Sequence, residues 1–247
     1  MSAYGYLADL YDSLTGDVPY GEFADYYESI FNKSGKSIKT VLDLACGTGT
    51  MACLLASRGY EIIATDASEE MLSVASEKIP GLVGCTPPFL LCQNMAELDL
   101  FGTVDAAICC LDGMNYALPE DLSEIFRRLA LFIEPEGILV FDVHTPERLR
   151  SLDGQIFSDE NEDMLCIWRA SFDEDENALF YDMDIFVREG HLWRRQSEEH
   201  IEYAHELPAL SEMLAASGFK EIKIRTDCPQ NDLGRVFITA INGRIQK

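Results

Sequence analysis

The segment with the clearest chemical content is VLDLACGTGT, residues 41–50, where an aspartate lies in an apolar run and a glycine-rich turn follows at once. The first N–H groups of a helix have no intrahelical partner, and glycine lets a ligand come close to the main chain. A glycine-rich turn that joins a strand to a helix is therefore typical of a ligand-binding site. The ligand expected here accommodates a carboxylate, Asp43, at the edge of the turn.

Two cofactor classes use this geometry. Residues 47–52, GTGTMA, match the GxGxxA fingerprint of dinucleotide-binding proteins. Residues 43–49, DLACGTG, form a second pattern that includes the acid. A dinucleotide would bring its pyrophosphate to this turn, where Asp43 would repel it, whereas a ligand with an ammonium and a sulfonium would be attracted. The carboxylate favours the second interpretation.

The segment VLDLACGTGT is similar, almost letter for letter, to the first motif of the class I S-adenosylmethionine-dependent methyltransferases. The resemblance covers residues 39–144 and 207–243, and the last two predicted strands resemble the family's C-terminal antiparallel hairpin, which a dehydrogenase would leave unexplained. It implies a Rossmann-like methyltransferase fold, S-adenosyl-L-methionine as the cofactor, and a transferase that moves a methyl group to an acceptor.

The resemblance also implies which residues bind the cofactor. Asp66 ends the second predicted strand and would accept two hydrogen bonds from the ribose hydroxyls. The segment ATDASEEML is similar to the family's second motif, which would place Met71 against the adenine. Asn94 stands where the family usually has an aspartate that binds the adenine amine, and its amide oxygen can still accept that bond. The implied cofactor-binding residues are Asp43, Ala45, Cys46, Gly47, Thr48, Gly49, Asp66, Ala67, Met71, Asn94, Met95, Cys110 and Leu111.

Residues 1–33 are rich in aromatic and acidic side chains, and their periodicity predicts two short helices interrupted around Thr15–Pro19. The pattern YDSLTGDVPY resembles a group of small bacterial methyltransferases in which this segment closes over the cofactor. We therefore expect Tyr11 and Tyr20 to cover the methionine end of the cofactor.

Methyl transfer from a sulfonium requires alignment, exclusion of water and, for some acceptors, a base. In an open α/β sheet the ligand crevice lies at the carboxyl ends of the strands. The loop LDGMNYAL supplies Asp112, Asn115 and Tyr116 to this edge, and His144, at the end of the fifth predicted strand, is a candidate general base. The reaction needs no metal, and we expect no metal site.

Strand and helix signals alternate through most of the chain. Continuous apolar strands separated by amphipathic helices predict a doubly wound α/β fold with a mostly parallel seven-stranded sheet. The helices are predicted at Thr50–Ser57, from Ser68 to about Lys78, from Pro119 to Ile133, and from Pro208 to Gly218. The predicted strands are Lys39–Asp43, Glu61–Asp66, Phe89–Cys92, Val104–Cys110, Gly137–His144, Phe219–Thr226 and Arg235–Asn242.

The period changes to two at about residue 151, which predicts a small antiparallel sheet inserted at 151–205. Residues 1–150 and 206–247 would then form the cofactor-binding domain. A sheet with one apolar face must cover something, so the insertion is interpreted as a lid over the acceptor or as a dimer surface. The alternating apolar residues are Met164, Cys166, Trp168, Ala170 and Phe172 in one strand, and Leu179, Tyr181, Met183, Ile185 and Val187 in the next. A third strand is predicted after Glu189–Gly190, in the segment LWRRQSEEHIEY.

The chain has 247 residues, a formal net charge of −24 and a sequence pI near 4.3. An acidic surface repels phosphate backbones and anionic lipids, which argues against nucleic acid and membrane partners. The eight cysteines form no CxxC pair and suit a reducing compartment. With no signal peptide or spanning segment in the sequence, we expect a cytoplasmic protein, monomeric or homodimeric.

Three function classes remain open from the sequence alone. The first is a methyltransferase with a small-molecule acceptor, within which a tRNA or protein acceptor is an alternative. The others are an NAD(P)-dependent reductase and a non-catalytic S-adenosylmethionine-binding protein. LDGMN follows the fourth predicted strand in place of an NPPY-like tetrad, so methylation of adenine N6 or of glutamine is not supported.

Overall fold

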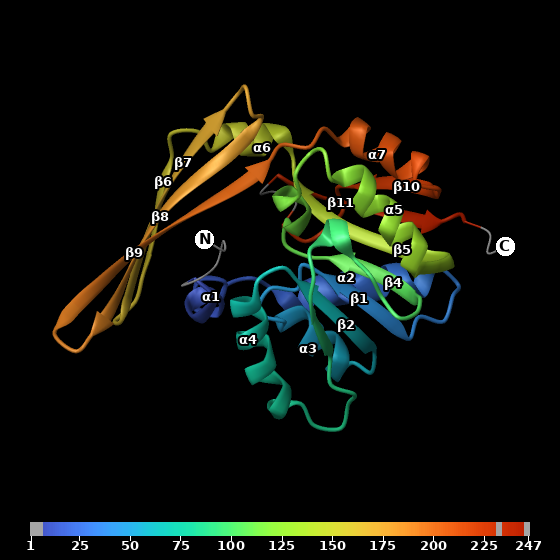
Figure 1. Cartoon of the computed structure of the whole chain (residues 1–247), viewed down its shortest axis with the longest axis horizontal. Helices are drawn as coiled ribbons and strands as arrows, with labels where there is room; N and C mark the ends of the chain where they lie inside the picture. Colours follow the sequence, from blue (N-terminus) through green and yellow to red (C-terminus); the bar gives the residue numbers. More distant parts are fainter. Residues whose placement is uncertain (1–6, 231–233, 245–247) are drawn as a thin grey trace.

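The computed structural model describes residues 7–230 and 234–244, apart from the side chain of Asp9. The first six residues of the predicted N-terminal segment 1–33 therefore lie outside the described residues. Helices and strands alternate along the chain around one large sheet, and a second sheet extends away from it (Figure 1).

The large sheet has seven strands in the order β10-β11-β5-β4-β1-β2-β3. Only β11 runs against the others, because it pairs antiparallel with both β10 and β5. The prediction of a doubly wound, mostly parallel seven-stranded sheet is thus confirmed. The strands are β1 (Thr40–Leu44), β2 (Glu61–Asp66), β3 (Phe89–Cys92), β4 (Val104–Cys109), β5 (Ile133–His144), β10 (Phe219–Arg225) and β11 (Arg235–Asn242).

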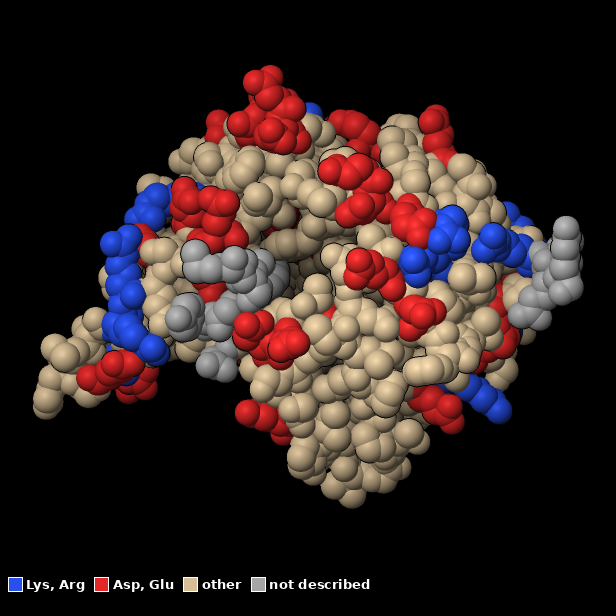
Figure 2. All heavy atoms as spheres, in the orientation of Figure 1, with Lys and Arg blue, Asp and Glu red and all other residues tan. Residues whose placement is uncertain are grey.

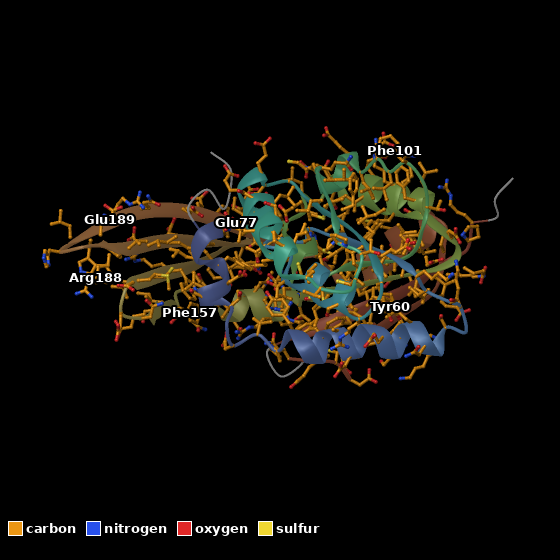
Figure 3. All side chains as sticks on the ribbon, turned by 90° about the horizontal axis from the view of Figure 1, so that it is seen from below. Tyr60, Glu77, Phe101, Phe157, Arg188 and Glu189 are labelled. Atoms are coloured by element: carbon orange, nitrogen blue, oxygen red, sulfur yellow. The ribbon has the colours of Figure 1, made fainter. Side chains whose placement is uncertain are left out.

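Helices cover both faces of this sheet (Figures 1 and 3). One face packs against α2 (Tyr20–Lys33) and α3 (Thr50–Ser57), and the other packs against α5 (Leu122–Phe132) and α7 (Leu207–Ala216). Along β1, Val41 faces the first layer and Leu42 the second, as alternation in a strand requires. The remaining helices are α1 (Ala8–Leu14), α4 (Glu69–Lys78), α6 (Pro146–Ser151) and the 3₁₀ turns η1 (Ile79–Gly81), η2 (Met95–Glu97) and η3 (Gly113–Tyr116).

Local signals set several helix ends. Ser68 caps α4, because its Oγ accepts a hydrogen bond from the Met71 N–H, as predicted. By contrast, α5 begins at Leu122 and not near Pro119. The N–H of Asp121 donates to the carbonyl of Leu118, so the proline lies in a turn before the helix.

Strand β5 is longer than predicted, because it begins at Ile133, which pairs with Val104 of β4. Gly137 therefore lies inside the strand and does not begin it. A Cβ at this position would lie 2.7 Å from the Asp105 carbonyl oxygen, and glycine alone permits this approach of the two backbones.

The second sheet has four antiparallel strands in the order β6-β7-β8-β9. The sequence pattern predicts three of them and misses β6, an edge strand with the mostly polar sequence IFSDE. Helix α6, which precedes it, is also missed, although Thr145 caps it and Pro146 occupies its first position. The strands are β6 (Ile156–Glu160), β7 (Met164–Asp173), β8 (Ala178–Glu189) and β9 (Leu192–Tyr203).

The predicted apolar residues of β7 and β8 share one face of this sheet. They pair directly across the two strands, as Trp168 with Met183 and Ala170 with Tyr181. The far end of β8, marked by Arg188 and Glu189 in Figure 3, extends away from the large sheet.

Helix α1 lies between the second sheet and α4 (Figure 1). Leu7, at its start, is buried against Cys166 and Ile185, and Leu10 and Leu14 pack on the same cluster. The predicted break in the N-terminal segment is present, because α1 ends at Leu14 and α2 begins at Tyr20. None of the described helices is long and apolar enough to cross a membrane.

Phe237 of β11 connects the large sheet to α2. Its fully buried ring lies 5.8 Å from that of Phe23 and 4.8 Å from that of Tyr26, between centroids.

We expect Phe237→Ala to lower the free energy of unfolding by about 3–5 kcal/mol, because the cavity left by the ring cannot close fully. Urea unfolding measures this loss. The control Phe101→Ala changes a fully exposed ring and should stay within about 0.5 kcal/mol; equal losses in both variants would contradict the packing described.

Candidate functional site

A cavity of about 660 Å³ lies where the carboxyl ends of β1, β2 and β4 face α1 and the apolar side of the second sheet. Figure 2 shows a hollow on this side of the molecule with acidic side chains around it. All of the predicted site residues line the cavity except Gly49, Asn115 and His144. Those that line it are Tyr11, Tyr20, Asp43, Ala45, Cys46, Gly47, Thr48, Asp66, Ala67, Met71, Asn94, Met95, Cys110, Leu111, Asp112 and Tyr116.

Asp43 is the last but one residue of β1 and lies at the wall of the cavity with 1% of its surface exposed. Neither carboxylate oxygen has a hydrogen-bond partner among the residues that the structure describes. Burial, followed by the negative charge of Asp66, raises the pKa of Asp43 to about 7, and the nearby Ala52 N–H partly offsets this rise. A buried carboxylate without a partner is costly, so this site is prepared for a cation.

The glycine-rich turn after β1 is held open by Asp66. The Gly47 N–H donates to Oδ2 of Asp66 at 2.8 Å, and the Ser68 N–H donates to Oδ1 at 2.9 Å. Gly47 itself has a φ of +54°, and a Cβ there would meet no other atom within 4 Å. The turn therefore presents bare main chain to the cavity. Burial raises the pKa of Asp66, although these backbone hydrogen bonds oppose the rise.

Gly49 serves packing, because it does not line the cavity. Its φ is +71°, and a Cβ would lie 2.9 Å from the Cβ of Ala75 in α4. Any side chain at Gly49 would therefore push α4 away from the turn.

Helix α1 is fastened over the turn by a polar cluster. Nζ of Lys78 in α4 lies 2.6 Å from Oδ2 of Asp12 in α1 and donates to the hydroxyl of Thr48 at 3.0 Å. The Thr48 hydroxyl in turn donates to Oδ1 of Asp12 at 2.6 Å. These contacts place Tyr11, the neighbour of Asp12, in the cavity wall.

The loop after β4 is held by a buried ion pair. Leu111 and Asp112 both have positive φ, at +58° and +53°, and their N–H groups donate to the two carboxylate oxygens of Asp142. Arg235 of β11 binds Asp142 through Nη1 and lies 2.8 Å from Oδ1 of Asp112 through Nη2. The guanidinium holds the pKa of Asp112 below its usual value, against the effect of burial.

His144 lies behind the cavity wall. Its Nε2 is 3.1 Å from Nη2 of Arg235, and its Nδ1 is 3.2 Å from Oε2 of Glu202. A guanidinium only donates, so this geometry assigns Nε2 as the acceptor and Nδ1–H as the donor to Glu202. Asp112 and Glu202 raise the pKa of His144, while burial and Arg235 oppose the rise.

Asn115 joins two elements and is fully buried. Its amide nitrogen donates to the carbonyls of Tyr203 at 3.0 Å and of His144 at 3.3 Å, and its oxygen accepts from the His144 N–H. The side chain thus ties the end of β5 to the end of β9.

Known proteins resemble this chain over almost its whole length. A model of the methyltransferase domain family matches residues 41–137. The chain is 34% identical over 227 residues to "Putative methyltransferase YqeM" of Bacillus subtilis, a match that covers 91% of this chain and 89% of the relative. The chain belongs to the class I S-adenosylmethionine-dependent methyltransferases.

Solved structures agree with this assignment. The methyltransferase matches an S-adenosylmethionine-dependent methyltransferase from Clostridium acetobutylicum with a TM-score of 0.83 and 26% identity, over 98% of this chain and 99% of that one. It also matches the sugar N-methyltransferase KedS8 from a Streptoalloteichus species, with a TM-score of 0.82 and 22% identity over 99% and 96% of the two chains. The second likeness shows the fold alone.

S-adenosyl-L-methionine is the cofactor of the enzyme, and the cavity fits it. The partnerless carboxylate of Asp43 suits an ammonium group, and the open main chain at Gly47 leaves room for a nucleoside. Asp66, whose carboxylate faces the cavity, can accept hydrogen bonds from a diol.

The sequence prediction misses the side chains that the second sheet of the methyltransferase contributes to the cavity lining. Along β9, His200 pairs with Tyr181 and Glu202 pairs with Leu179, so both share the apolar face of β7 and β8. Period two along β9 would have indicated this shared face. The missed lining residues from this sheet are Trp168, Tyr181, Met183, His200 and Glu202.

Ligand atoms of Asp112, His144 and Glu202 lie within 4.8 Å of one another, a spacing that could hold a metal ion. Arg235 already places a cation between two of them, at 2.8 Å from Asp112 and 3.1 Å from His144. The guanidinium thus accounts for the clustering of these groups.

The raised pKa of Asp43 predicts a pH-dependent stability for the enzyme without added cofactor. Because the folded pKa is about 7 against an ordinary 3.8, stability falls as pH rises through this window. Asp43→Asn cannot ionise, so at pH 8 it should be more stable than the wild type by up to about 4 kcal/mol, from about 1.36 kcal/mol per pKa unit. Urea unfolding at pH 5 and pH 8 measures this gain, and a gain that is equal at both values would contradict it.

Proposed function

We propose that the enzyme methylates a small molecule held between the cofactor and the inserted sheet. The observation that carries this proposal is the single continuous lining of the cavity, which runs from the glycine-rich turn to the inner face of β7, β8 and β9. Its volume suits a cofactor and a small acceptor and not a folded macromolecule. The net charge of −24 further disfavours tRNA.

The first half of the cavity binds the cofactor. Asp43 pairs with the ammonium of its methionine part, and Asp66 accepts hydrogen bonds from its ribose hydroxyls. Met71 packs against the adenine, and the Asn94 amide oxygen accepts from its amine. When bound, S-adenosyl-L-methionine supplies a methyl group already activated on a sulfonium. The other residues proposed to contact it are Ala45, Cys46, Gly47, Thr48, Ala67, Met95, Cys110 and Leu111.

The chain itself aligns the reactants and excludes water. Tyr11 and Tyr20 cover the methionine part of the cofactor from α1 and the start of α2. Both rings line the cavity, and the cluster of Lys78 and Asp12 holds α1 in this place.

Residues 151–205 act as the lid of the acceptor half, and residues 1–150 with 206–247 form the cofactor-binding domain. The packing of Leu7 and Leu14 on the apolar face of the insertion supports the lid over a dimer surface for this part of the face. Tyr116 and Asp112 complete the acceptor half from the loop after β4. Asn115 and His144 contribute by positioning their neighbours, because neither lines the cavity.

The fold of the enzyme is similar to the solved structure of KedS8, which is by its name a sugar N-methyltransferase, and this similarity supports a small acceptor. It supports no particular sugar here, because the identity is 22%.

Calorimetry with S-adenosylhomocysteine tests the cofactor half. We expect Asp43→Ala to weaken binding at least about 30-fold, since a desolvated charge pair contributes more than about 2 kcal/mol. The matched control is Asp182→Ala, which alters an exposed aspartate of β8. Unchanged affinity in Asp43→Ala, with both variants folded by circular dichroism, would overturn the proposal.

A further inference from the structure

The wall of the acceptor half holds more carboxylates than the structure neutralises. Arg235 contacts both Asp142 and Asp112, and Asp142 also accepts two backbone N–H groups. Glu202, in contrast, has an imidazole as its partner, His144. While Nε2 of His144 accepts from Arg235, the imidazole carries only the Nδ1 proton and is neutral, and in this state Glu202 is in direct contact with no cation among the described residues.

Glu202 is also placed to meet a ligand. It is 5% exposed and lines the cavity. Its Oε2 takes the hydrogen bond from His144, whereas its Oε1 accepts none from the part of the chain that the structure describes. A buried carboxylate with a spare oxygen at a cavity wall needs a donor from the ligand, and a charged donor meets the need best.

Aromatic rings surround the same part of the cavity. Tyr181 of β8 pairs with His200, two residues before Glu202 on β9, and the ring of Tyr116 lies 6.2 Å from that of His200, between centroids. Both tyrosines line the cavity. The faces of such rings attract cations, and a desolvated contact contributes about 2 kcal/mol. A carboxylate among aromatic rings is the lining expected for an amine in its ammonium form.

We propose that the acceptor is an amine, whose ammonium form binds Glu202 and gives up a proton to it before methylation. This inference rests on the proposed function and adds the chemical class of the acceptor. Glu202 is then a catalytic residue of the methyl transfer, and His144 is the residue that positions it.

The proton step balances as follows. An N–H bond of the ammonium breaks, its electron pair stays on nitrogen, and an O–H bond forms on Glu202. The nitrogen lone pair then forms the new N–C bond as the C–S bond of the donor breaks, with that electron pair left on sulfur. The product is a methylated ammonium and a neutral thioether.

The groups that face Glu202 come from four elements. His144 ends β5, Asp112 follows β4, Arg235 begins β11 and Tyr181 lies on β8. Burial raises the pKa of Glu202, while the hydrogen bond from His144 opposes the rise. This rise brings the pKa of Glu202 closer to the pKa of an amine, which makes transfer of the proton to Glu202 more favourable.

Binding of matched probe pairs to the full chain, saturated with S-adenosylhomocysteine at pH 8, tests the proposal. The pairs are glucosamine with glucose, cyclohexylamine with cyclohexanol, and butylamine with butanol, measured by saturation-transfer NMR. We expect the amine of at least one pair to bind at least tenfold more tightly than its alcohol. Equal responses, including no response from either member of every pair, would overturn the proposal.

Two substitutions on β9, Glu202→Gln and Glu199→Gln, show which side chain is responsible for the preference. Glu202→Gln should remove the preference for the amine. Glu199→Gln should keep this preference, because Glu199 lies three residues before Glu202, on the opposite, exposed face of the sheet. Calorimetry with S-adenosylhomocysteine accompanies each variant. Normal affinity for this ligand with no preference for amines refutes the amine inference alone, and loss of this affinity in the wild type refutes the proposed function.

The pH dependence of amine binding tests the part played by His144. As pH falls, protonated His144 becomes the cationic partner of Glu202 and competes with the ammonium. His144→Gln can still donate to Glu202 but takes up no proton, so the acid limb of amine binding should move to lower pH. A limb that stays at the wild-type pH would show that His144 does not act through Glu202.

Discussion

The cofactor half of the site is organised by the desolvation of one carboxylate, that of Asp43. Its position at the end of β1 is fixed by the strand order, because β1 pairs with β2 on one side and β4 on the other. The turn that follows exposes main chain and offers no side-chain partner to the acid. The folded protein thus keeps an unfavourable charge at the point where a cationic ligand relieves it. Stability is reduced locally in favour of binding.

A second buried charge, that of Arg235, connects the antiparallel strand β11 to the acceptor side. It balances two aspartates that shape the loop after β4, and it sets the orientation of the His144 ring. The backbone of that loop keeps its left-handed residues because Asp142 accepts both N–H groups. The C-terminal hairpin therefore shapes this side of the cavity, although it lies far from the first motif in the sequence.

Much of the α/β unit follows from local sequence. The helix Thr50–Ser57 and the strands at 61–66, 89–92 and 235–242 have the bounds expected from their patterns, because turn residues and apolar periods act over a few positions. The cofactor side of the cavity follows in the same way from the motif at 43–49. The roles of Arg235 and Glu202 could not be predicted from local sequence, because each of these residues contacts partners that are far away in the chain. The sequence predicts His144 and Asn115 in the cavity lining, and neither residue lies there. The His144 side chain contacts Glu202 and Arg235, and the Asn115 side chain contacts the end of β9.

Helix α1 belongs to both walls of the cavity. Leucines on it pack against the inserted sheet, and Asp12 pairs with Lys78 beside the glycine-rich turn. Displacing this helix breaks both sets of contacts at once. In the proposed function, a cofactor that leaves past α1 would also open the acceptor side, and a single seven-residue segment would then control both release steps of the catalytic cycle.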